Sequence, residues 1–196
     1  MGREFEKKYR ASAGALDAVR QRYGGFAAIH MATTYYDTPD RELSRRRWTL
    51  RQRQENDRTV CTLKIPLPDG SRGEWEVVSP SLDAGIPGLL AAGAPKELTE
   101  IISAGLEPVC GARFLRLAKA VSHENAVLEL ALDSGELLGG GSALPFWEIE
   151  VELKSGSDQA AERFGEALRQ EFHLTEEPES KFQRARKLAN GRERHV

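Results

Sequence analysis

Carboxylate side chains recur at alternate positions in two segments that lie far apart in the sequence. Glu4 and Glu6 occupy the first segment, and Glu148 and Glu150 occupy the second. Residues two apart in an extended strand share a face, so each segment places its carboxylates in one row. Oxygen ligands of this kind suit a hard divalent cation, whereas the four histidines are scattered without ligand spacing. The pattern therefore predicts a site for Mg²⁺ or Mn²⁺ rather than for zinc.

Basic side chains form rows of the same kind. Arg51 and Arg53 share one face of a predicted strand, and Lys64 shares a face with Thr62 in the next. Like charges a few ångströms apart repel by about 1 kcal/mol even in water, so rows of one sign require an ionic partner. The basic residues assigned to this role are Lys8, Arg51, Arg53, Lys64, Arg72 and one arginine of the run from Arg113 to Arg116.

A chain of phosphates satisfies both sets of charges. Guanidinium groups and divalent cations bind the same phosphate oxygens, and phosphoryl transfer is catalysed mainly by positioning and charge neutralisation. No covalent nucleophile is then required. We expect one metal ion to orient a triphosphate while a second metal ion, or a glutamate, activates the attacking water.

The elements that would carry these residues are mostly strands. Alternation of period two predicts strands at 3–10, 30–36, 49–54, 59–65, 73–78, 127–133 and 146–154. Helical spacing predicts helices at 13–23, 160–172 and 181–189, with one or two short helices between 79 and 105. Ser12, Ser180 and either Ser157 or Asp158 are the expected caps of the three long helices.

In these strands the charged faces alternate with apolar faces, for example Ile149 and Val151 between the glutamates of 148–152. One interpretation is an open sheet with helices on one face and water on the other. Segregated carboxylate and guanidinium rows favour a second interpretation, in which the sheet closes so that acidic strands face basic ones across a wet lumen. The predicted fold is α+β, a closed antiparallel barrel with helices packed outside.

The whole chain is expected to be a single domain, residues 1–196, because its length suffices for one core without a linker. Its 28 basic and 30 acidic residues give a net charge of -2, which offers no bulk attraction to nucleic acid. Cys61 and Cys110 lack metal-ligand spacing, and the sequence contains neither a signal peptide nor an 18-residue apolar stretch. We therefore expect a cytoplasmic protein without a membrane partner. A homodimer is expected only because symmetric dimers are the commonest assemblies.

Several motifs resemble those of the CYTH family, also called triphosphate tunnel metalloenzymes, and they follow one another in the same order along the chain. Glu4-Phe5-Glu6-Lys7-Lys8 matches its ExExK signature, and the remaining blocks follow in the family's order. These blocks are Tyr35 to Pro39 with Leu50 to Arg53, then Thr62 to Lys64, Arg72 with Glu74 and Glu76, Leu128 to Asp133, Glu148 to Glu152, and Ser180 to Phe182. The resemblance implies an eight-stranded tunnel that binds Mg²⁺ or Mn²⁺ through acidic residues and a triphosphate through basic ones.

The resemblance assigns roles to the residues of this chain that match the family's motifs. The expected metal ligands are Glu4, Glu6, Glu148 and Glu150, with Asp133 and Glu152 nearby. The expected phosphate contacts are Lys8, Arg51, Arg53, Lys64 and Lys181, joined by Arg116 in preference to Arg113. Arg72, Glu74 and Glu76 are left between phosphate binding and an internal ion-pair network. Glu4, Glu6, Lys8 and Glu150 are the residues to which we assign catalysis.

The resemblance favours inorganic triphosphate as the substrate, with free phosphate as the product. Similar proteins of this family hydrolyse thiamine or nucleoside triphosphates, and some cyclise ATP to cyclic AMP, which is the main alternative. An enzyme specific for a nucleotide or for thiamine triphosphate would need an aromatic side chain on which the ring of the substrate can stack. Trp48, Trp75, Phe146 and Trp147 are the candidates for this aromatic platform. The third hypothesis is a noncatalytic module that binds polyphosphate or a nucleotide.

Overall fold

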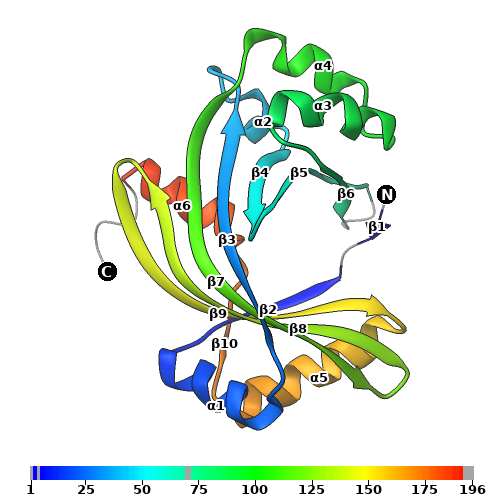
Figure 1. The fold of residues 1–196 in the computed structure, drawn as a ribbon, viewed down its shortest axis with the longest axis vertical. Coiled ribbons are helices and arrows are strands. Elements are labelled where there is room, and N and C mark those ends of the chain that lie inside the picture. The colour runs from blue at the N-terminus through cyan, green and yellow to red at the C-terminus, as the bar shows by residue number, and fades with distance from the viewer. Residues whose placement is uncertain (1, 4, 69–71, 192–196) are drawn as a thin grey trace.

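The computed structural model describes residues 2–3, 5–68 and 72–191. In these ranges, ten strands form an antiparallel sheet in the order β1-β6-β5-β4-β3-β7-β8-β9-β2-β10 (Figure 1). The strands are β1 (Gly2–Arg3), β2 (Glu6–Arg10), β3 (Ala27–Asp37), β4 (Thr49–Glu55), β5 (Arg58–Pro66), β6 (Arg72–Val78), β7 (Glu107–His123), β8 (Ala126–Gly139), β9 (Ser142–Ser155) and β10 (Thr175–Glu176).

The helices in the described ranges are α1 (Ala13–Tyr23), α2 (Glu42–Arg45), α3 (Leu82–Ala91), α4 (Glu97–Ile101), α5 (Asp158–Glu171) and α6 (Lys181–Ala189), with one 3₁₀ turn at Ile102–Ala104. Ser12, Ser157 and Ser180 each accept a hydrogen bond from a backbone N–H of the first turn, so the three expected caps are present and Ser157, not Asp158, caps α5. Across these ranges, every helix falls short of the length and apolar character needed to span a membrane.

The expected closed barrel is wrong, because the strand order has two ends. The predicted strand 3–10 is divided: residues 2–3 pair with β6, whereas Glu6–Arg10 pair with β9. Only two residues separate β1 from β2, so the Cα atoms of Arg3 and Glu6 lie at most about 11 Å apart and the sheet must curl strongly. On its other side β2 pairs with β10, which takes the edge that a closing strand would need.

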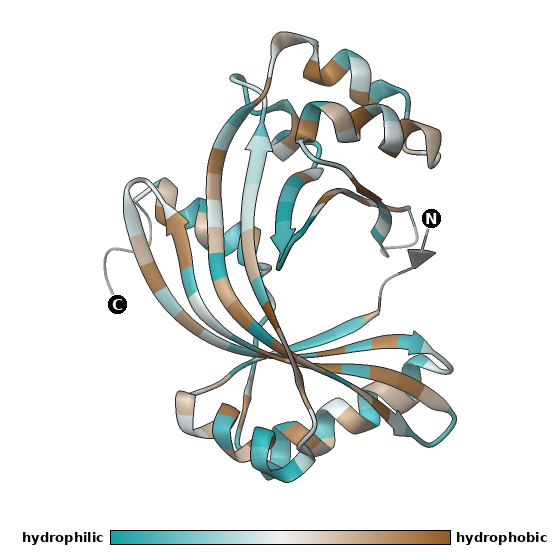
Figure 2. Ribbon diagram, in the orientation of Figure 1, coloured by the Kyte–Doolittle hydropathy of each residue, from teal (hydrophilic) through white to brown (hydrophobic). Residues whose placement is uncertain are grey.

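The convex face of the curled sheet carries the two larger apolar clusters. One joins α1 and α5 to β2, β8 and β9 through residues such as Tyr9, Leu130 and Phe164, and the other joins α3 and α4 to β4, β5 and β6 through Leu63 and Leu89. Figure 2 shows the hydropathy alternating along the long strands. The apolar positions of the alternation therefore face outward under helices, as predicted, and leave the polar positions on the concave side.

Helix α6 departs from the prediction that helices pack only outside. Its Ala185 packs with Met31 and Phe114, two side chains that face the cavity enclosed by the curled sheet, and Lys181 and Phe182 line the same cavity. Lys181 and Arg184 lie on the side of α6 that faces buried carboxylates of β8 and β9. The concave face is consequently part apolar, beneath α6, and part charged, where α6 begins.

The convex packing depends on a close approach between α5 and β2. A Cβ placed on Gly165 would lie 2.5 Å from the hydroxyl of Tyr9, which is fully buried and has no hydrogen-bond partner in the described structure. We expect Gly165→Ala to lower the free energy of unfolding by about 1 to 3 kcal/mol through overpacking. Adding Tyr9→Phe should recover part of that loss because it removes the clashing atom.

Chemical denaturation of the single and double variants measures this coupling. Gly14→Ala is the matched helical control, because its Cβ would meet nothing closer than 3.9 Å, and it should be neutral or slightly stabilising. Equal losses in Gly165→Ala with and without Tyr9→Phe would contradict the assignment of the clash to the hydroxyl.

Candidate functional site

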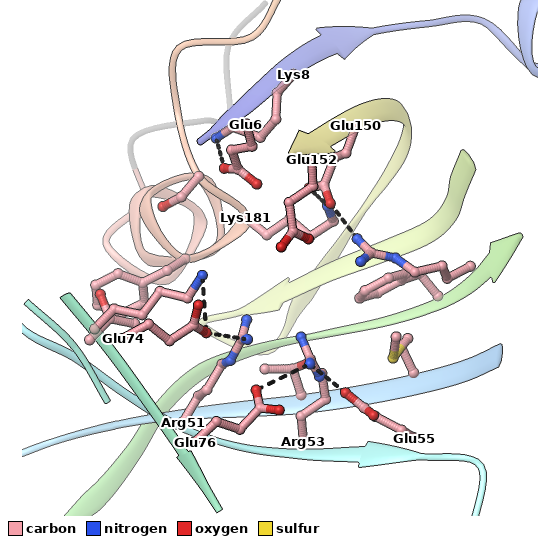
Figure 3. Close-up of a pocket in the computed structure, with 18 of the residues that line it drawn as sticks. Glu6, Lys8, Arg51, Arg53, Glu55, Glu74, Glu76, Glu150, Glu152 and Lys181 are labelled. Carbon is pink, nitrogen blue, oxygen red and sulfur yellow. Dashed lines mark hydrogen bonds and ion pairs between the residues drawn. The ribbon is translucent and has the colours of Figure 1, made fainter. Parts of the chain in front are cut away.

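The concave side of the sheet encloses a cavity of about 490 Å³. Its walls are dominated by charged side chains from seven strands and from the start of α6 (Figure 3). The basic lining residues are Lys8, Arg51, Arg53, Lys64, Arg72, Arg116, Lys154 and Lys181, and the acidic ones are Glu6, Glu55, Glu74, Glu76, Glu129, Glu150 and Glu152. Among the described lining residues, positive and negative charges nearly balance. An anionic ligand would therefore bind through the local arrangement of basic side chains rather than through a large net positive charge of the cavity.

One wall, which we call the basic wall, consists of Arg51 and Arg53 of β4, Lys64 of β5 and Arg72 of β6. Alternation places these side chains on the concave face, while Leu50 and Leu63 are fully buried in the convex core. Burial lowers the pKa of Arg53, and the neighbouring charge of Arg51 lowers it further. The Nε atom of Arg53 is buried and makes no hydrogen bond within the described part of the chain. This wall concentrates donors suited to anionic oxygens.

The opposite wall, which we call the carboxylate wall, is formed by β2, β8 and β9. Register brings Glu6 directly opposite Glu152, and Glu152 directly opposite Glu129. Lys154 contacts two of these carboxylates, at 2.8 Å from Glu152 and 3.7 Å from Glu129. Lys8 lies 3.6 Å from Glu6 and donates to the carbonyl oxygen of Glu179 at 3.3 Å. Oxygen ligands therefore gather on the face that looks across at the basic wall, as Figure 3 shows for Glu6, Glu150 and Glu152.

Behind the carboxylate wall lies a buried ion-pair cluster. The ammonium of Lys181 contacts Glu148, lies 2.8 Å from Asp133 and lies 2.7 Å from Glu150. Arg116 binds Asp133 with two hydrogen bonds of 2.7 and 2.8 Å and also contacts Glu150, while Arg184 contacts Glu148. Three carboxylates thus meet three cations, and α6 supplies two of those cations.

The cluster shifts the pKa values of its members in different directions. Burial would raise the pKa of Glu150, but Lys181 and Arg116 outweigh it and hold that pKa well below the usual range. For Glu148 the effect of burial dominates and raises the pKa, although Lys181 opposes it. Burial would lower the pKa of Lys181, but Asp133 and Glu150 raise it instead. Glu150 is therefore an anion, and Lys181 a cation, across the neutral range.

Three carboxylates of this cluster could hold a metal ion. Oxygens of Asp133, Glu148 and Glu150 lie within 4.8 Å of one another, and an all-oxygen set fits a hard divalent cation. Lys181 contacts the same three carboxylates, so an ion centred on all three would compete with the ammonium. Glu150 differs from the other two because it also lines the cavity, beside Glu6 and Glu152.

The structure gathers most of the predicted site residues into one place. Lining the cavity are Glu6, Lys8, Arg51, Arg53, Lys64, Arg72, Arg116, Glu150, Glu152 and Lys181. Asp133 and Glu148 are fully buried beside the cavity and are occupied by the cluster. Arg113 is exposed and lies on the opposite face of β7 from Arg116, so Arg116 is the arginine of that run that reaches the cavity. Glu4 lies outside the described residues.

Sequence reasoning missed four charged residues of the site. Glu129 lies four positions before Asp133 on the same face of β8, and Lys154 continues the alternation of 148–152, so periodicity alone could have found both. Arg184 follows Lys181 at helical spacing, which places it on the same side of α6. Glu55 ends β4 two positions after Arg53, so the same alternation places it on the cavity face beside Arg53.

None of the candidate aromatic platforms lies at the described cavity surface. Trp48 and Trp75 pack in the convex cluster with α3 and α4, and Phe146 is buried beneath Lys181 and Arg184. Trp147 is 40% exposed and does not line the described cavity. The aromatic side chains that do line the cavity are Tyr35, Phe114 and Phe182. Each is at most 9% exposed, so each presents little open ring surface to a ligand.

Comparison with known proteins agrees with this geometry. A family model described as the CYTH domain matches residues 2–185. The chain belongs to the CYTH domain family. The resemblance seen in the sequence motifs is thereby confirmed over nearly the whole length.

Individual relatives extend the comparison. This chain is 30% identical over 142 residues to the inorganic triphosphatase of Haemophilus influenzae. The match covers 71% of this chain but only 40% of that protein. Two solved structures share its fold. One, from Hippeastrum, is described as a candidate adenylyl cyclase with a dominant triphosphatase activity (20% identity, TM-score 0.69, 95% of this chain and 96% of that chain). The other is a candidate adenylate cyclase from Bacillus halodurans (22% identity, TM-score 0.65, 94% and 98%).

The buried cluster leads to a prediction about Lys181. Lys181→Met leaves Asp133, Glu148 and Glu150 without their shared ammonium, and we expect a loss of about 3 to 5 kcal/mol in the free energy of unfolding. Because the competing ammonium is gone, Mn²⁺ should raise the melting temperature of this variant more than that of the wild type. Thermal and chemical denaturation with and without Mn²⁺ measure both effects.

Lys187→Met is the matched control on the same helix. Lys187 pairs at the surface with Glu179, so its loss should change stability by less than about 0.5 kcal/mol. A Lys181→Met protein as stable as the wild type would show that the cluster contributes no net stability.

Proposed function

We propose that this CYTH domain is a divalent-metal-dependent triphosphatase whose substrate is inorganic triphosphate. The observation that carries the proposal is the pair of facing walls in one cavity, one rich in guanidinium and ammonium groups and the other in carboxylates. A linear triphosphate needs both kinds of group. Its oxygens are held by basic donors, and the metal ions that neutralise it require oxygen ligands.

The basic wall is proposed to bind the phosphate chain. Arg51, Arg53 and Lys64 present donors from adjacent strands, and Arg72 lines the same wall without an ion pair to any described residue. Arginine's planar fork suits phosphate oxygens, whereas a lysine acts as a point charge. Lys8 and Arg116 approach from the carboxylate side, so the chain of phosphates would be contacted from both walls.

The carboxylate wall is proposed to hold Mg²⁺ or Mn²⁺. Glu6, Glu150 and Glu152 line the cavity, and the low pKa of Glu150 keeps it ionised for ligation. The bound metal would supply charge neutralisation of the phosphate oxygens. Of the chain's own groups, a cavity glutamate is proposed to accept the proton of the attacking water. Asp133 and Glu148 would support this wall mainly by fixing Lys181 and Arg116.

The choice of inorganic triphosphate rests on what the cavity presents beside its charges. Tyr35, Phe114 and Phe182 are nearly buried, and Phe114 packs edge-on against Phe146. An adenine or thiazolium ring gains much of its binding energy by stacking on an open aromatic face. The described cavity surface is short of such a face, which favours a ligand composed of phosphates alone. The relative named an inorganic triphosphatase points to the same substrate.

Product analysis tests the proposal directly. Purified protein incubated with tripolyphosphate and Mg²⁺ or Mn²⁺ should release phosphate, with less release from ATP or thiamine triphosphate. Formation of cyclic AMP from ATP as the main reaction would instead identify an adenylate cyclase. Binding of tripolyphosphate without turnover under either metal would identify a noncatalytic module.

Two arginine variants test the cavity itself. Arg53→Gln removes a donor from the basic wall, and we expect kcat/KM for tripolyphosphate to fall by about 100-fold, which corresponds to roughly 2.7 kcal/mol of lost transition-state stabilisation. Arg113→Gln is the control, because Arg113 is exposed on the outer face of β7, and it should keep wild-type activity. Steady-state phosphate release measures both. Equal activity of the two variants would exclude the basic wall as the binding surface.

A further inference from the structure

Two glutamates of β6 lie within the basic wall, where a pure anion site would place cations. Glu74 is directly opposite Lys64 in the β5–β6 ladder, and its carboxylate lies 3.4 Å from the ammonium of Lys64 and 3.7 Å from the guanidinium of Arg51. Figure 3 shows Glu74 reaching toward Arg51 across the cavity face. Directly opposed strand residues are close enough for such pairs to form whenever the cavity is empty.

Glu76 repeats the arrangement two residues further along β6. It accepts a hydrogen bond of 3.2 Å from the hydroxyl of Thr62 and lies 3.8 Å from the guanidinium of Arg53. The same terminal nitrogen of Arg53, Nη2, also contacts Glu55. Each of the principal cations of the basic wall therefore already has at least one carboxylate partner.

These pairs lie where water cannot fully replace them. The side chains of Arg51, Arg53 and Lys64 are each 14% exposed. A largely buried cation without a counter-ion is costly, so the glutamates stabilise the empty cavity. A phosphate chain that bound the same donors would have to displace them. The side chains of Glu74 and Glu76 are 23% and 38% exposed, so both can turn toward water when displaced.

We infer that Glu74 and Glu76 are exchangeable counter-ions that govern how readily phosphate ligands leave the basic wall. They neutralise Arg51, Arg53 and Lys64 in the empty cavity, yield these donors to the phosphate chain, and take them back as the product departs. The inference rests on the proposed function, in which hydrolysis leaves pyrophosphate or phosphate among the same cations. Neither glutamate contacts the reacting atoms; both act through the basic side chains that they neutralise.

Glu74→Gln distinguishes this role from a purely structural one. The amide occupies the same space but no longer competes as an anion, so we expect pyrophosphate to bind about tenfold more tightly, which corresponds to roughly 1.4 kcal/mol. Titration calorimetry without metal measures this affinity for pyrophosphate and for tripolyphosphate. In steady-state assays KM and kcat should both fall, because the substrate binds more tightly and the product leaves more slowly. If Glu74 served only to orient Arg51 and Lys64, both ligands would bind more weakly.

Stability provides an independent readout. Without ligand, Glu74→Gln should melt at a lower temperature than the wild type, since Arg51 and Lys64 lose a counter-ion. Adding pyrophosphate should close that gap, because the ligand replaces the missing charge. A lower melting temperature that pyrophosphate does not restore would contradict the exchange.

Three further variants complete the design. Glu74→Asp retains the charge and should keep affinities near those of the wild type. Glu76→Gln alters a more exposed carboxylate, so it should fold readily and tighten pyrophosphate binding in the same direction. Glu107→Gln is the matched control, because Glu107 pairs with Arg41 at 3.0 Å outside the cavity, and it should change neither affinity nor KM. A wild type that binds no tripolyphosphate would overturn the proposed function, whereas binding that neither glutamine variant tightens would overturn this inference alone.

Discussion

The matching of opposite charges on the concave face is the constraint on which the rest of this structure depends. Charged side chains that are largely withdrawn from water must find partners, because an unpaired buried charge costs several kcal/mol. The buried cluster satisfies this requirement between β8, β9 and α6, where Lys181 joins Asp133, Glu148 and Glu150. Glu74 and Glu76 satisfy it within the basic wall. The cavity is thus ordered by ion pairs rather than by apolar packing.

The apolar residues accordingly do their packing on the other side of the sheet. Helices α1 and α5 cover one part of the convex face, and α3 and α4 cover another, so two separate clusters bury the outward positions of the strands. Beneath α6 the concave face carries a third apolar cluster, around Phe114 and Ala185. Helix α6 therefore has two functions in the fold. It buries apolar surface at one end of the cavity and delivers Lys181 and Arg184 to the carboxylates.

This arrangement has a consequence for binding. The ion pairs of Arg51, Arg53 and Lys64 stabilise the cavity without a ligand, so an anion that binds these three side chains replaces existing contacts. For the proposed phosphate ligand, the affinity would then be the difference between two sets of ion pairs. Such a balance allows a multiply charged anion to bind and to leave, which an unopposed row of buried arginines would hinder.

Several features followed from local pattern. Period-two alternation identified the strands that carry Glu6, Arg53, Lys64 and Glu150, and it assigned their apolar neighbours to a face covered by helices. Serine caps marked the starts of α1, α5 and α6 correctly. Long β7 was missed, because Pro108 and Gly111 interrupt its beginning and it lacks a clean alternation. The strands β1 and β10 have only two residues each, which is too short for any period to appear.

The sequence by itself determined which residues share a strand face, and hence that carboxylates and basic groups would form separate rows, because side-chain direction in a strand is fixed by the local backbone. Tertiary structure alone decided how those rows meet. Whether the sheet closes depends on hydrogen bonds between segments far apart in sequence, and here β1 and β2 take different partners while β10 takes an edge of β2. Likewise, the contact between Glu148 and Lys181 depends on where α6 packs against the sheet, and the contact between Glu74 and Arg51 depends on the register of the strands. No local periodicity encodes these distances.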